Sequence, residues 1–134
     1  MERIGITNRT ALSAVSLLVL VGAGCATYPE NVSYLYGERI HRANIHTFAT
    51  AIVAVDGRTT MPRSEPVRVE PGRHVIELGT APTAGFRFAG TRELLLDVEP
   101  CRRYYIVAER ANRLQQDWRP IVDHTEPAGG ENCR

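Results

Sequence analysis

Two carboxylates stand at a spacing that could support acid–base chemistry. Asp97 and Glu99 are two residues apart in the stretch 93–99, which alternates as a strand does, so both side chains would lie on one face. The opposite, apolar face of this stretch is formed by Leu94, Leu96 and Val98. Because that face would pack inward, a solvated outer face is the favoured interpretation of the two carboxylates.

Other residue types used in catalysis or metal binding are isolated in the sequence. His74 would lie on the apolar face of a predicted strand over 74–78, where a histidine bonded to the backbone is favoured over a catalytic base. Neither Ser33 nor Ser64 is flanked by the glycines of a nucleophile elbow. The remaining histidines share no metal-ligand spacing: His41, His46 and His124. We therefore expect no enzyme, no metal site and no cofactor.

Four arginines could form an anion-binding patch for phosphate or carboxylate groups: Arg68, Arg73, Arg102 and Arg103. Such a patch would bind a ligand if an exposed aromatic side chain, from Tyr104, Tyr105 or Trp118, lay beside it in a groove. The two tyrosines are adjacent on a predicted strand and point to opposite faces, so at most one can line such a surface. The favoured alternative is ion pairing with the nearby acids Glu70, Glu77 and Glu99.

The two cysteines near the C-terminus, Cys101 and Cys133, predict a disulfide, with two unpaired thiols as the alternative. Closing a loop of about 33 residues contributes roughly 3–4 kcal/mol in the chain-entropy model. No histidine lies within a few residues of either cysteine, which disfavours a shared metal site. The bridge would hold the C-terminal tail against a predicted hairpin of the strands 103–110 and 117–124.

Length and composition bound the fold that must position these residues. A chain of 134 residues with 43% apolar residues is one domain by length, and its net charge of +1 argues against a nucleic-acid partner. All 16 basic residues are arginine, which excludes a Schiff-base lysine and a lysine-dependent phosphate loop. Short apolar runs, separated by prolines and glycines, predict strands rather than helices. These runs cover residues 45–55, 67–69, 74–78, 93–99, 103–110 and 118–124, with a further short strand at 86–88. We therefore predict an all-β domain over residues 44–134, a small antiparallel β-sandwich of six to seven strands.

The N-terminal segment has the features of an export signal. Arg3 and Arg9 precede an uncharged stretch over residues 11–24, which is shorter than the roughly 20 residues of a membrane span. Its end, Gly22-Ala23-Gly24-Cys25, resembles the signal of bacterial lipoproteins, although Gly22 stands where that family usually has an aliphatic residue. The alternatives are an ordinary secretory signal or a retained anchor helix.

The lipoprotein resemblance implies cleavage after residue 24 and attachment of fatty acyl chains, such as palmitate, to Cys25. Ala26 in the next position implies delivery to the outer membrane, facing the periplasm. The 110 remaining residues (134 − 24) would be formally neutral, and residues 25–43 would form a tether, with ordering at Val32–Tyr36 one option. The membrane, through the lipid, is then one expected partner.

A second resemblance concerns the predicted sandwich. The stretches Ile52-Val53-Ala54-Val55-Asp56-Gly57 and Glu70-Pro71-Gly72-Arg73-His74, with the later Tyr104-Tyr105 pair, are similar to PEGA-type and DUF2846-type modules. The resemblance covers about half of the chain and rests mostly on turn residues. It implies a non-catalytic β-sandwich on an exported protein, and it assigns no functional residue.

These observations lead to two expectations for function. The first is a non-catalytic, envelope-anchored lipoprotein that acts as a structural or protein-interaction module, with another envelope protein as its partner. The alternative is a binding domain for an envelope glycan or an anionic lipid.

Overall fold

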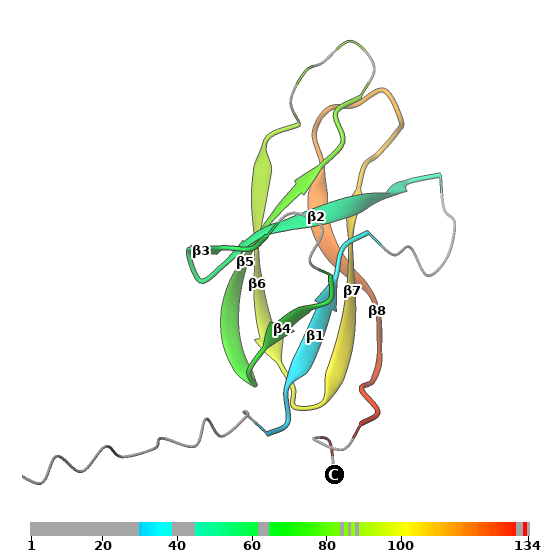
Figure 1. Cartoon of the computed structure of the whole chain (residues 1–134). Coiled ribbons are helices and arrows are strands. Elements are labelled where there is room, and N and C mark those ends of the chain that lie inside the picture. Colours follow the sequence, from blue (N-terminus) through cyan, green and yellow to red (C-terminus); the bar gives the residue numbers. More distant parts are fainter. Residues whose placement is uncertain are drawn as a thin grey trace, which may run out of the picture.

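The computed structural model describes residues 30–38, 45–61, 65–83, 85, 87, 89–130 and 133. The predicted signal peptide, Cys25 and the tether up to residue 29 lie outside the described residues, as do His41, Ser64 and most of the proposed strand at 86–88. The described residues are all-β and form eight strands, which confirms the predicted fold class (Figure 1). The six runs predicted as strands each contain a strand, and the structure adds two more, Ser33–Tyr36 and the two-residue Arg58–Thr59 next to the Asp56-Gly57 turn.

The strands fall into two packed layers that share β2. The bounds are β1 Ser33–Tyr36, β2 Thr47–Val55, β3 Arg58–Thr59, β4 Val67–Val69, β5 Gly72–Thr80, β6 Thr91–Val98, β7 Arg102–Glu109 and β8 Arg119–Pro127. The sheet order is β4-β1-β7-β2-β5-β6, with β8 on the other edge of β7 and β3 on β2. We call the layer of β4, β1, β7, β8 and the start of β2 the β7 sheet. The layer of β3, β5, β6 and the rest of β2 is the β5 sheet.

Strand β2 joins the layers because it changes partners along its length. Thr47 to Ala49 pair with β7, whereas Thr50 to Val55 pair with β5, and the register shifts at Val53. The change of partner falls between Ala49 and Thr50, and the bulge at Val53, which bends the strand further, lies within the part paired with β5. In Figure 1, β2 runs across both layers.

The core lies between the two sheets and is filled by the inward residues of each strand. From the β7 sheet it includes Leu35, Tyr104 and Ile106, and from the β5 sheet Ile76 and Leu96. The alternation predicted for 74–78 and 93–99 is confirmed, since Leu95 is 61% exposed while its neighbour Leu96 is buried. Tyr104 and Tyr105 point to opposite faces, as predicted, with Tyr104 in the core.

Within the predicted tether, Ser33–Tyr36 forms strand β1 inside the sandwich, which agrees with the option of ordering at Val32–Tyr36. β1 lies between β4 and β7, and it is parallel to β7, so the sheet is mixed rather than wholly antiparallel. Leu35 and Ser33 are fully buried, and the Ser33 hydroxyl donates to Glu99 O at 2.6 Å. Three of its four residues are buried, so the strand carries no clear alternation of polar and apolar residues, and the sequence indicated ordering here only as an option.

A disulfide joins Cys101 and Cys133 at one end of the sandwich, with the Cα atoms 5.5 Å apart. The predicted hairpin placed Cys101 opposite Glu126. In the structure Cys101 lies opposite Ala128, whose N–H donates to Cys101 O at 2.8 Å, so the predicted register is wrong by two residues. Cys101 N also donates to Asn31 O at 3.2 Å, just before β1. The entry of the described chain, the β6–β7 turn and the C-terminal tail therefore meet at this end, which we call the disulfide end.

Candidate functional site

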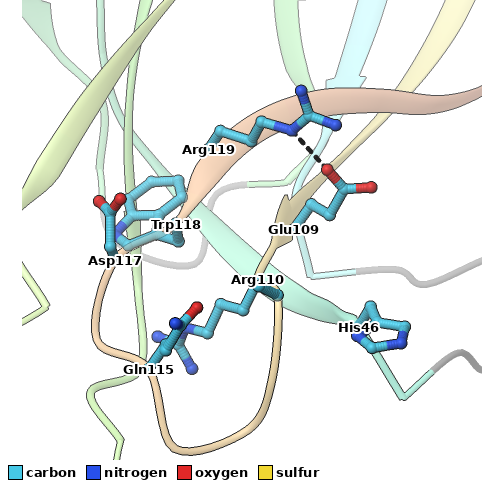
Figure 2. Close-up of a pocket in the computed structure, with 8 residues that line it drawn as sticks. His46, Glu109, Arg110, Gln115, Asp117, Trp118 and Arg119 are labelled. Carbon is cyan, nitrogen blue, oxygen red and sulfur yellow. Dashed lines mark hydrogen bonds and ion pairs between the residues drawn. The ribbon is translucent and has the colours of Figure 1, made fainter.

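A pocket of about 510 Å³ opens at the opposite end of the sandwich from the disulfide. Strand β7 connects the two ends, since Arg102 follows Cys101 directly and Glu109 precedes Arg110 in the pocket wall. The pocket is lined by the start of β2 and by the β7–β8 loop and its flanks: His46, Glu109, Arg110, Ala111, Gln115, Asp117, Trp118 and Arg119 (Figure 2). We call this region the pocket end.

Among the lining residues, Arg110 is a buried charged side chain whose hydrogen-bonding capacity is not filled. It is only 4% exposed, and its Nη2 donates to Ala81 O at 2.6 Å. Its guanidinium carbon lies 4.8 Å from the centre of the Phe48 ring, a cation–π contact. Among the described residues, Nε is buried without a hydrogen-bond partner and no carboxylate forms an ion pair with this arginine.

The two acids in the pocket wall are each paired with a different arginine. Glu109 binds Arg119 across the β7–β8 pair, as the dashed line in Figure 2 shows. Asp117 binds Arg92 of β6 at 3.1 Å. The charge of Arg110 is therefore left without a counter-ion in the wall.

The energetic balance at Arg110 favours an additional anion. Taking a cation out of water costs several kcal/mol even after the surroundings relax. A hydrogen bond to a charged group contributes about 1.5–3 kcal/mol and a desolvated cation–π contact about 2 kcal/mol, so the contacts of Arg110 offset much of that cost. A ligand carboxylate or phosphate would supply the missing counter-charge, and a guanidinium binds either group well.

The pocket is held in shape by contacts between the β5–β6 and β7–β8 loops. The Gln116 side-chain oxygen accepts hydrogen bonds from both the backbone and the hydroxyl of Thr83, at 3.0 and 2.6 Å. The Trp118 indole donates to Ala89 O at 3.1 Å, and the ring itself belongs to the core. Loops tied in this way to a rigid scaffold can present a preformed binding site.

The four arginines predicted to form an anion-binding patch are not brought together. Arg73 lies on the outer face of the β5 sheet, where it pairs with Asp97 at 3.0 Å. Arg103 lies on the outer face of the β7 sheet, on the other side of the molecule. Arg102 pairs with Glu99 at 3.0 Å, as the ion-pair alternative predicted. Arg68 is exposed on the edge strand β4 and shares the outer face of the β7 sheet with Arg103, because both are aligned with Tyr34 of β1, which lies between them.

The outer face of the β7 sheet carries a connected polar and aromatic cluster. Tyr105 stacks on Tyr36 with ring centres 5.0 Å apart, and its hydroxyl donates to Glu126 Oε1 at 2.7 Å. Arg103 donates to the same oxygen at 3.2 Å. The bonds from Tyr105 and Arg103 lower the pKa of Glu126, while burial and then Glu126 raise the pKa of Tyr105. Since the carboxylate is already shared by two donors, this cluster indicates a braced surface.

His74 is held by two bonds, which agrees with the prediction of a backbone-bonded histidine. Its Nδ1 lies 2.7 Å from Asp56 Oδ2 and its Nε2 lies 2.8 Å from Glu70 O, beside a second cavity of about 500 Å³. The Val75 N–H and then His74 lower the pKa of Asp56. Burial lowers the pKa of His74, but its bonds to Asp56 and Glu70 outweigh burial, and the net shift is upward. With both ring nitrogens engaged, His74 is placed to brace β5 against the β2–β3 turn.

The carboxylates considered for acid–base chemistry are also engaged. Asp97 and Glu99 form the ion pairs with Arg73 and Arg102 described above, and their side chains are 73% and 64% exposed. Within the part of the chain that the structure describes, no group of three or more histidine, cysteine or acidic side chains could hold a metal ion. In the same part, no helix is long and apolar enough to cross a membrane.

In comparisons with known proteins, no family model, curated protein or solved structure matches this chain.

Sequence reasoning did not find the pocket or Arg110. Arg110 follows Glu109 at the end of an ordinary strand and has no glycine-rich motif around it, so it resembles any arginine at a strand end. Its burial depends on Ala81 and Phe48, which are 29 and 62 residues away in the chain (110 − 81 and 110 − 48). Trp118 was considered as a groove residue, and it does line the pocket, but beside Arg110 rather than beside the four predicted arginines.

Proposed function

We propose that this protein is a bacterial envelope lipoprotein, anchored through acylated Cys25, whose β-sandwich acts non-catalytically as an interaction module. The observation that carries the proposal is the short distance in sequence between Cys25 and the fold. β1 begins at Ser33, eight residues after Cys25 (33 − 25), and it is a central strand of the β7 sheet. Eight residues span at most about 28 Å when fully extended. An acylated Cys25 would therefore hold the sandwich close to the membrane surface.

The position of β1 also determines which end of the sandwich would face the lipid. The chain enters β1 at the disulfide end, beside Cys101 (Figure 1). The pocket end lies at the far end of β7, a strand of eight residues that spans about 26 Å. In this arrangement the pocket end points away from the membrane, towards the compartment where soluble or wall-bound partners are found.

The contacts of the candidate catalytic groups support a non-catalytic role. Both nitrogens of His74 are engaged, Asp97 and Glu99 are in ion pairs, and the Tyr104 hydroxyl accepts a hydrogen bond from Glu99 N at 2.7 Å. Groups held in this way brace the fold, and they are not free to exchange protons with a substrate. The resemblance to PEGA-type and DUF2846-type modules agrees with this role.

Anchoring is tested with the Cys25→Ser variant of the full chain. We expect the wild-type protein to fractionate with membranes and the variant to lose this property, because stable anchoring requires several acyl chains on one residue. The matched control is the double variant Cys101→Ser/Cys133→Ser, which removes the other two cysteines and should still be acylated. Mass spectrometry that finds unmodified Cys25 in the mature wild-type protein would overturn the proposal.

The interaction role is tested by photo-crosslinking in cells. A photoreactive residue at Leu114, which is 82% exposed in the β7–β8 loop, samples the pocket end, and one at Leu95 samples the β5 sheet. We expect a discrete adduct with an envelope component from Leu114 that disappears when Cys25→Ser releases the protein. If neither position gives a discrete adduct while the protein is anchored, an interaction module is the wrong description.

A further inference from the structure

We propose that the pocket end binds a carboxylate-bearing ligand through the buried guanidinium of Arg110. The inference deepens the proposed function by naming the chemical class of the ligand, and it rests on that function only for the orientation of the pocket. It differs from the arginine patch expected from the sequence, because Arg110 is not one of the four arginines of that patch.

The first argument is the uncompensated charge. Arg110 is 4% exposed, and among the described residues its guanidinium makes one hydrogen bond, from Nη2 to Ala81 O, while its backbone N–H donates to His46 O. The remaining contact is the face of the Phe48 ring, and the wall carboxylates of Glu109 and Asp117 are bound to other arginines. A buried arginine in this state lacks the anion that such groups normally have.

The second argument is the character of the other lining groups. His46, Gln115 and the Trp118 ring line the same pocket as Arg110 (Figure 2), and together they provide polar and apolar contacts. A volume of about 510 Å³ suits a small ligand rather than a single ion. Gln115 and Arg110 line the same pocket, so the amide is available as a second polar partner for a ligand that occupies it.

The third argument distinguishes a carboxylate from a phosphate. Glu109 and Asp117 carry negative charge in the wall even though each is paired. A singly charged carboxylate neutralises Arg110 with less repulsion from these acids than a doubly charged phosphate would experience. The orientation argues in the same direction, because a pocket at the far end of β7 from the lipid does not face the phosphate headgroups.

Two sources of a carboxylate fit this chemistry, the C-terminus of a peptide and the acid group of a sugar. The probes are N-acetyl-Ala-Ala and its C-terminal amide for the first, and methyl glucuronide and methyl glucoside for the second. Inorganic phosphate is the fifth probe. Each pair differs in the carboxylate alone, so the neutral member controls for contacts with the rest of the ligand.

The direct measurement uses the mature wild-type protein in detergent, labelled with ¹⁵N. We expect saturable movement of the Arg110 Nε–Hε resonance with at least one carboxylate probe, and at least tenfold weaker binding of its neutral partner. The probe that saturates identifies the source of the carboxylate. The inference is overturned if no probe moves this resonance, if charged and neutral partners bind equally, or if phosphate binds more tightly than both carboxylates.

Variants of the full chain provide the second measurement. Arg110→Met should weaken binding of the responding probe at least tenfold, whereas Arg113→Met, an exposed arginine in the same loop, should leave it unchanged. If Arg110→Met does not fold by circular dichroism, Arg110→Lys replaces it, and the wild-type resonance alone remains decisive. Binding without membrane anchoring would overturn the proposed function and keep this inference. Anchoring without ligand binding would overturn this inference and leave the proposed function standing.

Discussion

The two ends of the sandwich treat their polar groups differently. At the disulfide end, the Ser33 hydroxyl bonds both Glu99 O and Arg102 N, the Tyr104 hydroxyl bonds Glu99 N, and Arg102 pairs with the Glu99 carboxylate. At the pocket end, Arg110 is buried with an Nε that has no partner among the described residues. The polar groups named at the disulfide end are hydrogen-bonded or ion-paired to one another. At the pocket end, the Arg110 guanidinium still has a donor that a ligand could bind.

The largest effect is expected from breaking the disulfide end. Cys101→Ser should lower the free energy of unfolding by roughly 3–4 kcal/mol, because the unfolded chain regains the entropy of an open loop. Urea denaturation of the oxidised wild type and the variant measures this difference. Cys133→Ser is the matched control and should give the same loss. A difference under about 1 kcal/mol in both would mean that the tail contributes little to the fold.

A smaller effect is expected from Tyr104→Phe in the same region. The change keeps the ring in the core but removes the hydroxyl that accepts from Glu99 N, so the free energy of unfolding should fall by about 1–2 kcal/mol. Tyr34→Phe, on the half-buried outer face of β1, is the control and should change stability by less than about 0.5 kcal/mol. Equal losses in the two variants would show that the Tyr104 hydroxyl has no special role in bracing this end.

At the pocket end, stability and binding should respond in different ways. Arg110→Met should change the free energy of unfolding by less than about 1 kcal/mol, or raise it, since removing a buried charge that lacks a counter-ion offsets the lost bond to Ala81. Thermal denaturation of the unliganded protein measures this. A loss of 3 kcal/mol or more would assign Arg110 to the structural framework and remove the contrast between the ends.

The smallest effect concerns pH and the brace formed by His74 and Asp56. The pKa of His74 is raised in the fold, so its stabilisation is complete below about pH 6.5, the unfolded value, and is lost as the pH rises through the folded pKa. The pKa of Asp56 is lowered, so its stabilisation is present above about pH 3.8 and is lost as the pH falls through the folded pKa. This pair should therefore contribute most between these values.

Denaturation at pH 5.5 and pH 8.5 tests the histidine side of this window. The contribution of this pair to the free energy of unfolding should be slightly larger at pH 5.5 than at pH 8.5. His74→Gln should reduce the difference in unfolding free energy between the two pH values. Asp56→Asn, which removes the charged partner, should reduce it as well. An unchanged difference in both variants would show that the pair does not couple folding to protons.

The all-β class and the inner faces of β5 and β6 could be predicted because they depend on local patterns. Leu94, Leu96 and Val98 alternate with exposed residues, and a half-buried strand must carry that alternation. The pairing of Cys101 with Cys133 was predictable by counting once Cys25 was assigned to lipid, although the register of the tail was wrong by two residues. The role of β1 was only partly predictable: ordering at Val32–Tyr36 was one option, but its place between β4 and β7 depends on pairing with strands that are distant in the chain.

What the sequence determined by itself is therefore the class of the fold, the disulfide and the expectation of a lipid anchor, which all depend on residue types at short spacing or on counting. The tertiary structure alone decided which arginines form ion pairs with carboxylates and which are buried without one. Arg73, Arg102 and Arg103 have carboxylates beside them, while Arg110 is covered by the β5–β6 loop and the start of β2. Burial and ion pairing depend on segments that are distant in the chain, so the local sequence of each arginine did not show whether it would be paired or buried.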